Sequence, residues 1–271
     1  MSMWSLCEGD RMKHIVHFSG GKDSTAMLLM MLEKGMQIDD IIFCDTGMEF
    51  PEMYTHIAKV EQYIGRPITK IKADKSFEYY MFEHTKTKSK KKNKGYGWCR
   101  NWVRWCTRLL KKEPTRKYLK EKYKDEPLVQ YLGIAYDEPK RHARIMDNEV
   151  HPLFDWEITE SEALQYCYAR GFDWGGLYEQ FSRVSCWCCP LQGLREVRSL
   201  RKYHPTLFSR LREMDKRVDY KFRPDYSVED LEIRFQLEEE FEAQGKPTGR
   251  HREFQQELKR RLGRSKETDD A

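Results

Sequence analysis

The stretch that most constrains the fold is HIVHFSGGKDSTAMLLMMLEKG, residues 14–35. Its first apolar residues, Ile15, Val16 and Phe18, predict a buried parallel strand, and residues 26–32 predict a helix packed against it. Between them, residues 19–25 bring two adjacent glycines, several hydroxyl groups and the free amides of a helix start into one small space. Donors that converge in this way predict an anion-binding loop at the carboxyl end of the strand.

The loop differs from a Walker A phosphate loop. The spacing that precedes Gly-Lys-Ser/Thr is missing, and Asp23 follows the lysine where a hydroxyl is expected. Lys22 supplies a point charge that would neutralise negative charge developing during phosphoryl chemistry. Asp23 has an alternative role, because an acid in the first turn of a helix complements the macrodipole. We predict Lys22 and Asp23 as the catalytic residues.

Apolar runs of strand length alternate with helical patterns along the chain, which predicts an α/β fold with a doubly wound parallel sheet. Right-handed connections would bring residues 19–25 and the Asp45-Thr46-Gly47 turn to the same edge of that sheet. The expected strands lie at 14–18, 38–46, 68–73 and 128–136, and the expected helices at about 23–35, 51–64 and 101–124. The capping-box spacing of Thr159 and Glu162 predicts a further helix that starts near Glu160 and stops at Gly171.

A family resemblance rests on five segments. Residues 19–25, SGGKDST, resemble the PP-loop of the N-type ATP pyrophosphatases. Later segments resemble the phosphoadenosine-phosphosulfate (PAPS) reductase family of that adenine nucleotide alpha hydrolase-like superfamily. They are IIFCDTGMEFPE (41–52), RWCTRLLKKEP (104–114), YLGIAYDEPKRHAR (131–144) and the block from PLFDW to CWCCP (152–190). The resemblance covers roughly residues 13–200, and its motifs are most similar to iron–sulfur sulfonucleotide reductases and to DNA phosphorothioation sulfurtransferases.

The resemblance implies a nucleotide site. Arg141 and Arg144 would bind acidic substrate groups, because guanidinium forks match phosphate geometry. Ala135 stands where the family has its first arginine in that loop. The full set of implied nucleotide-binding residues is Ser19, Gly20, Gly21, Lys22, Asp23, Ser24, Thr25, Asp45, Thr46, Gly47, Gly133, Arg141 and Arg144.

The spacing of the cysteines is a second pattern in the sequence, and it indicates metal binding. Cys99 and Cys106 lie in one segment, and Cys186 and Cys189 form a Cys-x-x-Cys pair in another. Four thiolates predict either a zinc site or an iron–sulfur cluster, and spacing alone leaves both open. By resemblance, Cys106, Cys186 and Cys189 take ligand positions of a 4Fe–4S cluster, whereas Thr107 replaces the second cysteine of the family's adjacent pair.

The fourth ligand has two candidates. Cys99 lies seven residues before Cys106, about two turns away if the segment is helical, so we predict that it faces the same side. Cys188 is the alternative. Cys7, Cys44 and Cys167 are predicted to be small buried hydrophobic residues.

The resemblance also bears on whether the protein reduces a sulfonucleotide or uses ATP to activate an acceptor for sulfur transfer. Sulfonucleotide reductases carry a C-terminal Glu-Cys-Gly motif, and no cysteine follows Cys189 in this sequence. We therefore expect ATP with Mg²⁺ to adenylate an acceptor and release pyrophosphate, so that sulfur from a donor protein can replace the activated oxygen. A sulfonucleotide reductase and a non-catalytic nucleotide-binding module with structural zinc are the alternatives.

A lysine-rich segment precedes the first cysteine pair. It holds six lysines between Lys86 and Lys94. Lysines bind phosphates and aromatic rings stack on bases, so the segment predicts a nucleic-acid acceptor. The alternative is a solvated loop before an amphipathic helix that buries its tryptophans. The aromatic residues concerned are Tyr96, Trp98, Trp102 and Trp105.

The length of 271 residues suits one large domain with an appendage. We predict a PAPS reductase-like domain at 1–222, which includes the cysteine segments, and a charged helical appendage at 223–271 with a break at 245–249. No apolar stretch approaches the length of a membrane span, and the first residues lack a signal-peptide pattern. We therefore expect a cytoplasmic protein with no membrane partner.

Overall fold

The structure is a computed structural model that divides the chain into two compact units. The first unit comprises Met1–Phe77 and Arg104–Trp187, and the second comprises Glu78–Val103 and Cys188–Ala271. The described residues are 12–85, 94–124, 126–184 and 186–264. Cys7 and the predicted lysine run up to Lys92 therefore lie outside the described residues. The boundary at residue 222 remains a prediction.

A parallel sheet forms the centre of the first unit. Its strand order is β3-β2-β1-β4-β5, and all four strand pairs are parallel. This arrangement confirms the predicted doubly wound α/β fold, and it places the switch in strand order between β1 and β4. The strands are β1 (Lys13–His17), β2 (Asp40–Asp45), β3 (Thr69–Lys72), β4 (Leu128–Leu132) and β5 (Glu149–Val150).

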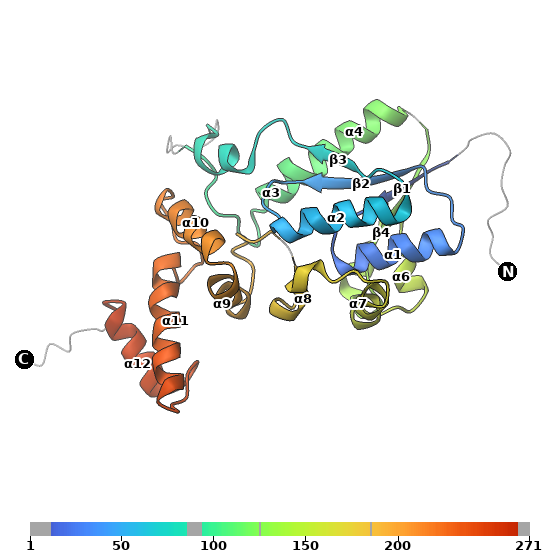
Figure 1. Cartoon of the computed structure of the whole chain (residues 1–271). Helices are drawn as coiled ribbons and strands as arrows, with labels where there is room; N and C mark the ends of the chain where they lie inside the picture. Colours follow the sequence, from blue (N-terminus) through green and yellow to red (C-terminus); the bar gives the residue numbers. More distant parts are fainter. Residues whose placement is uncertain (1–11, 86–93, 125, 185, 265–271) are drawn as a thin grey trace, which may run out of the picture. The chain divides into compact units, whose positions relative to one another are not determined.

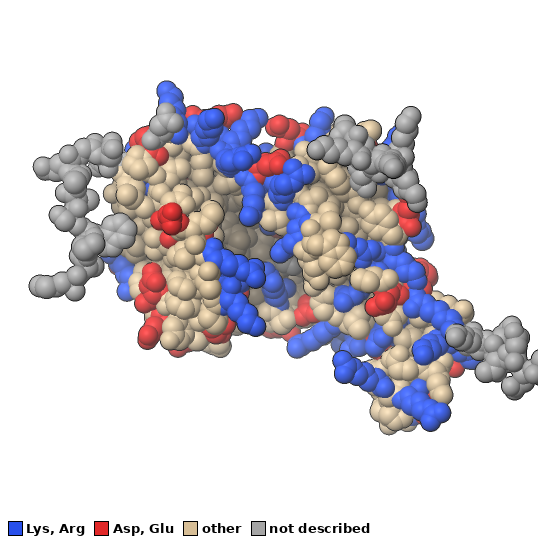
Figure 2. All heavy atoms as spheres, turned by 180° about the vertical axis from the view of Figure 1, so that it is seen from behind, with Lys and Arg blue, Asp and Glu red and all other residues tan. Residues whose placement is uncertain are grey.

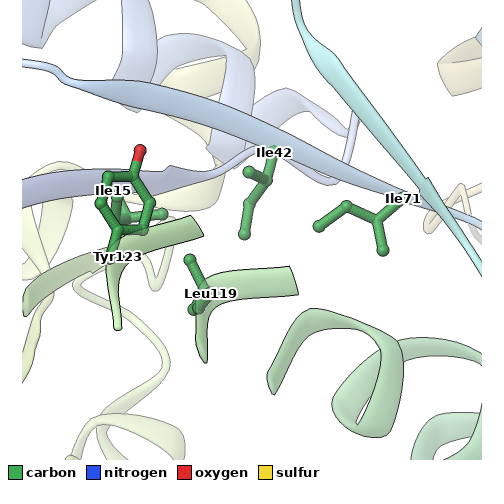
Figure 3. Close-up of a cluster of buried hydrophobic side chains, with 5 residues drawn as sticks. All are labelled: Ile15, Ile42, Ile71, Leu119 and Tyr123. Carbon is green, nitrogen blue, oxygen red and sulfur yellow. The ribbon is translucent and has the colours of Figure 1, made fainter. Parts of the chain in front are cut away.

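Helices cover both faces of this sheet (Figure 1). Ile15 and Val16 are both fully buried, as expected for a strand whose alternating side chains meet helices on either face. On one face, Ile15, Ile42 and Ile71 pack against Leu119 and Tyr123 of α4 (Figure 3). The helices of this unit are α1 (Lys22–Glu33), α2 (Pro51–Ile64), α3 (Trp105–Thr107), α4 (Glu113–Tyr123), α5 (Pro139–His142), α6 (Pro152–Asp155), α7 (Glu160–Tyr168) and α8 (Leu177–Gln180).

Local signals set several helix ends. The Thr159–Glu162 capping box is present, with the Glu162 amide 3.3 Å from Thr159 Oγ1, so α7 begins at Glu160 as predicted. Helix α2 begins with Pro51 and ends before Gly65, which has a φ of 64°. Proline at the first helical position and a left-handed glycine after the last are the residues that these sites favour.

The segment before α3 differs from the prediction. A helix was expected from about residue 101, but Arg100 and Val103 form a tight turn, with both backbone N–O distances at 3.1 Å. Arg104, with φ −91° and ψ 61°, then precedes α3, and a π-helical stretch, η2 (Arg108–Lys112), links α3 to α4. The expectation that Cys99 lies two helical turns from Cys106 is therefore wrong, because the turn replaces the helix.

The second unit is mainly helical. Trp98 is buried in it and donates a 2.7 Å hydrogen bond from Nε1 to Asp215, while Phe222 packs edge-on against its ring. Leu237, Phe241, Phe254 and Leu258 form a core between the last two helices. The helical elements are η1 (Tyr79–Glu83), α9 (Leu194–Tyr203), α10 (Pro205–Lys216), α11 (Val228–Ala243) and α12 (Arg252–Arg261).

None of the helices in the described part of the chain is long and apolar enough to cross a membrane.

Shortening a buried side chain of the sheet should lower the free energy of unfolding by a large amount. Ile15→Ala, at a fully buried position, should lower the free energy of unfolding by about 2–5 kcal/mol through lost burial and a residual cavity. Ile145→Ala, at a position that is 42% exposed, is the matched control and should change it by less than about 0.5 kcal/mol. Urea unfolding measures both, and equal effects would contradict the packing described here.

Candidate functional site

The predicted anion loop joins β1 to α1 and is shaped by its own hydroxyl groups. Ser24 Oγ accepts a 3.1 Å hydrogen bond from the Ser19 amide and donates a 3.0 Å bond to the Gly21 carbonyl. Ser19 Oγ lies 3.0 Å from the same Ser24 oxygen. Because α1 starts at Lys22, the amides of its first turn have no partners within the helix. Apart from the Lys22 amide, which donates to Tyr178, these amides and the exposed Ser19 form a cradle for an anion.

Two glycines, one in this loop and one after β4, allow close packing around the cradle. Gly20 has a φ of 79°, and a Cβ there would lie 2.5 Å from Met53 Sδ. Gly133, at the end of β4, approaches the start of α1 so closely that a Cβ would lie 2.8 Å from the Ser24 amide nitrogen. Any larger residue at either position would displace the loop, so both glycines serve its shape.

Residues 174–178 hold the loop from the other side. Trp174 Nε1 donates a 2.7 Å hydrogen bond to the Gly20 carbonyl, and the Tyr178 hydroxyl accepts a 2.8 Å bond from the Lys22 amide. Trp174 also stacks on His56, with the ring centroids 4.3 Å apart. Burial raises the pKa of Tyr178, so its phenol stays neutral. The loop is therefore fixed by hydrogen bonds from a segment about 150 residues further along the chain.

Lys22 is buried, with 9% of its side chain exposed. Its ammonium group contacts the Asp23 carboxylate at 3.1 Å and forms a short ion pair with Glu160, the first residue of α7. Burial alone would lower the pKa of Lys22, but Asp23 and Glu160 raise it above its ordinary value. Lys22 therefore stays charged and ties α1 to α7.

Asp23 is the perturbed acid of the cradle. Burial raises its pKa to about 6, Lys22 opposes the rise, and Glu160 and Glu138 add to it. Near neutral pH the cradle therefore carries a carboxylate beside the lysine, and this carboxylate becomes neutral in mildly acidic solution. An acid in such a position suits a bound cation or a proton-transfer step.

The Asp45-Thr46-Gly47 turn lies at the carboxyl end of β2 and is held by neighbouring side chains. The Asp45 carboxylate accepts hydrogen bonds from the Gly47 amide (2.9 Å) and the Tyr54 hydroxyl (2.7 Å), and pairs with Lys72 at 3.1 Å. Gly47 has a φ of 73°, a backbone conformation that favours glycine. A Cβ built at this position would meet no atom within 4 Å, so the neighbouring residues leave space for a side chain. The turn is rigid and leaves room beside Gly47.

Thiol groups gather near this turn. Cys186 Sγ lies 3.7 Å from Thr46 Oγ1 and 3.7 Å from a carboxylate oxygen of the buried Glu49. Lys111 Nζ lies 3.9 Å from that carboxylate. Burial alone would lower the pKa of Lys111, but Cys186 and Glu49, followed by Cys44 and Cys106, raise it. Three cysteines of the first unit therefore favour the charged form of Lys111.

The predicted metal ligands divide between the two units. Cys106 and Cys186 lie in the first unit, and Cys99, Cys188 and Cys189 lie in the second. Among the described residues, no three Cys, His, Asp or Glu side chains are grouped as metal ligands. Cys106 and Cys186 supply the sulfur donors that zinc and iron–sulfur clusters prefer, and both lie near Lys111. The four-cysteine site stays a prediction.

Two other cysteines were predicted to be small buried hydrophobic residues. Cys167 is fully buried, and burial raises the pKa of its thiol to about 12. Cys44 is only half-buried, with its sulfur 3.1 Å from Thr115 Oγ1, and it lines a cavity of the first unit. The prediction is therefore confirmed for Cys167 and incomplete for Cys44.

That cavity lies between the sheet and α4 and has a volume of about 640 Å³. Ser19 of the loop, His17 at the end of β1, and Cys44 line one part of it, together with Lys111. Burial lowers the pKa of His17, and its Nε2 lies 2.8 Å from Gln130 Oε1. A ligand held by the loop could therefore extend into an open, largely apolar space.

Three other predicted nucleotide-binding residues, Thr25, Arg141 and Arg144, have different surroundings in the structure. Thr25 is fully buried, and its hydroxyl lies 3.0 Å from His56 Nε2. Arg141 pairs with Glu138 at 2.6 Å, and Arg144 is exposed in the same loop. Their contacts with a nucleotide stay predictions.

Sequence reasoning gave no role to several residues that the structure brings to the site. Their place depends on the packing of α1 against α7 and of residues 174–178 against the loop, which no local pattern reveals. The capping box did locate the start of α7, but not the helix it would contact. The residues missed are Glu49, Lys111, Glu160, Trp174 and Tyr178.

Anion binding to the cradle should depend on pH through Asp23. The Asp23 carboxylate is neutralised as pH falls through about 6, so sulfate should bind about tenfold more tightly at about pH 5 than at about pH 7.5. Sulfate is the probe because its own charge does not change in this range.

Asp23→Asn is the matched control for this titration. It should bind sulfate about as tightly at both pH values, and calorimetry measures the affinities. If the Asp23→Asn protein retains the full pH dependence of sulfate binding, that dependence comes from another group, such as His17.

The chain matches a family model described as the phosphoadenosine phosphosulfate reductase domain over residues 13–192. A crystal structure of phosphoadenylyl-sulfate (PAPS) reductase from Candida auris, as a phosphate complex, is similar with a TM-score of 0.47 and 19% sequence identity. The match covers 65% of this chain and 81% of that chain.

Two proteins of Methanocaldococcus jannaschii and one of Escherichia phage lambda are related in sequence. Uncharacterized protein MJ0066 is 29% identical over 72% of this chain and 40% of its own length, and uncharacterized protein MJ0973 is 26% identical over 80% and 51%. The uncharacterized nin region protein ORF290 of the phage is 29% identical over 48% and 50%. The chain thus spans about half the length of the curated relatives it matches. Since the family model covers well over half of the chain, the protein belongs to the phosphoadenosine phosphosulfate reductase domain family.

Proposed function

We propose that this protein is an ATP-dependent enzyme that adenylates an acceptor, releases pyrophosphate and thereby prepares the acceptor for sulfur transfer. The observation that carries the proposal is the charge arrangement in the PP-loop, where two carboxylates, from Asp23 and Glu160, flank the Lys22 ammonium group. Carboxylates beside a phosphate cradle would repel a bare sulfonucleotide. They suit a triphosphate that brings Mg²⁺, which proteins hold with one or two carboxylates plus phosphate oxygens.

The residues of the loop have distinct tasks in this reaction. The first-turn amides of α1 and the Ser19 hydroxyl would bind the β- and γ-phosphates, and Lys22 would neutralise the charge that develops on departing pyrophosphate. A bond forms between the acceptor oxygen and the α-phosphorus while the bond to pyrophosphate breaks. Trp174 and Tyr178 hold the loop in place throughout, so catalysis comes from positioning and charge.

A 4Fe–4S cluster, with zinc as the alternative, is proposed on Cys99, Cys106, Cys186 and Cys189, with Cys188 as the other candidate for the fourth ligand. Bound there, a cluster would hold or deliver sulfur for the activated acceptor. The Lys111 ammonium group near Cys106 and Cys186 would balance the negative charge of their thiolates. A donor protein would supply the sulfur, and we propose a reducing, cytoplasmic setting for these thiols.

Two other functions lead to different products. Membership of the family favours a sulfonucleotide reductase, which would release sulfite from a phosphosulfate without consuming ATP. A nucleotide-binding module with structural zinc would release neither product. Metal and sulfide analysis of an anaerobic preparation, followed by assays for pyrophosphate and sulfite, distinguishes all three.

Lys22→Met tests the proposed role of the PP-loop. Methionine retains the buried hydrocarbon but removes a charge-assisted contact worth about 1.5–3 kcal/mol, so Mg·ATP should bind about 10- to 150-fold more weakly. Acceptor-dependent pyrophosphate release should fall at least as much.

Lys34→Met, at an exposed position after α1, is the matched control and should leave both quantities unchanged. Calorimetry and a pyrophosphate assay make the measurements. Unchanged ATP affinity in Lys22→Met would reject the proposed triphosphate site.

A further inference from the structure

Four basic residues recur at intervals of four along the helical segment that leads through α4: Lys112, Arg116, Lys120 and Lys124. Residues four apart lie on the same side of a helix, about 6 Å from one another. All four side chains are exposed, and all four residues line the cavity between α4 and the sheet. We call this row the α4 basic stripe. From Lys112 to Lys120 it extends along the helical segment for about 12 Å. Lys124 follows directly after α4 with a φ of 52°, which lies outside the helical range.

The cations of the α4 basic stripe differ from their neighbours in lacking acidic partners. On the same segment, Lys111 lies near Glu49, Lys117 near Asp74 and Lys122 near Asp40. Within the described residues, none of the four stripe residues forms an ion pair. Like charges four residues apart destabilise a helix by about 0.2–0.5 kcal/mol for each pair. A row of unpaired cations therefore carries a cost that a bound polyanion would offset.

The cavity beside the stripe is mostly apolar. Its walls include strand and loop residues from the sheet side, while Ser19 of the PP-loop lies at the cavity as well. Glu149 is the one acid among the described residues that line it. Lys and Arg side chains also gather on the face of the molecule turned to the reader in Figure 2. The apolar wall residues are Ile42, Leu119, Leu128, Leu132 and Met146.

We propose that the α4 basic stripe and this cavity bind a single strand of nucleic acid. Successive phosphates would lie on the four cations of the stripe, and unpaired bases would turn toward the apolar wall. A duplex would satisfy the stripe but not the wall, because its bases face each other. The stripe residues are different residues from those of the predicted lysine run at 86–94. The inference that this strand is the acceptor for adenylation rests on the proposed function. The inference that the strand binds to the stripe does not.

The test measures fluorescence anisotropy of a labelled single-stranded oligonucleotide with the full chain. Replacing the four stripe residues, Lys112, Arg116, Lys120 and Lys124, by Gln should weaken binding about tenfold or more. The slope of log K against log salt should fall by up to about 2.8, from about 0.7 for each phosphate contact on a single strand. The matched control replaces four exposed lysines outside the cavity, Lys34, Lys70, Lys75 and Lys117, by Gln and should change affinity less than twofold.

Equal losses in the stripe and control variants would overturn the proposal. Polyphosphate or poly-glutamate binding as tightly as the oligonucleotide would reduce the surface to a general polyanion site. Tighter binding of duplex would contradict the role of the apolar wall. Displacement of the oligonucleotide by Mg·ATP would assign the stripe to the nucleotide itself.

The Lys22→Met protein separates this proposal from the proposed function. It should bind the oligonucleotide like the unmodified chain while losing pyrophosphate release. If the unmodified protein shows stripe-dependent oligonucleotide binding but no pyrophosphate release from ATP, the proposed function alone is rejected.

Discussion

The ion pairs of Lys22 with Asp23 and Glu160 are the interaction on which the site depends. They join the first turn of α1 to the first residue of α7, and so connect the PP-loop to a segment about 140 residues away. A buried ammonium group requires such partners, because desolvation would otherwise remove its charge. The hydrogen bonds from Trp174 and to Tyr178 then fix the loop around that charge. These contacts hold the cradle in one shape, which lowers the cost of binding.

The fold could be predicted from local patterns because each strand and helix carries its own signal. The apolar run before Ser19 and the Thr159–Glu162 capping box both acted as expected. Two local predictions were wrong for physical reasons. The Arg100–Val103 turn replaces the start of a helix, which removes the basis for facing Cys99 toward Cys106. The site was harder to predict, because Glu160, Trp174 and Tyr178 reach it only through tertiary packing.

The first unit carries groups of opposite charge at two places. Acidic side chains lie beside the PP-loop, where a metal-bearing triphosphate would need them, and Asp23 has a pKa of about 6 there. Basic side chains that form no ion pair within the described residues lie along α4 at the cavity, and the charges of Cys186, Cys44 and Cys106 favour the charged form of Lys111. Such a distribution suits two anionic ligands that meet near the carboxyl ends of β1 and β2. It accords with a nucleotide and an acceptor brought together by charge and position.

The central claim is that the PP-loop recognises the phosphate chain of a nucleotide. Calorimetric titration of one preparation with Mg·ATP, pyrophosphate with Mg²⁺, and AMP tests it most directly. The account predicts that ATP and pyrophosphate bind, and that AMP binds at least about tenfold more weakly, because it lacks the groups that meet Lys22 and the first-turn amides. AMP binding as tightly as ATP, with no detectable binding of pyrophosphate, would contradict it.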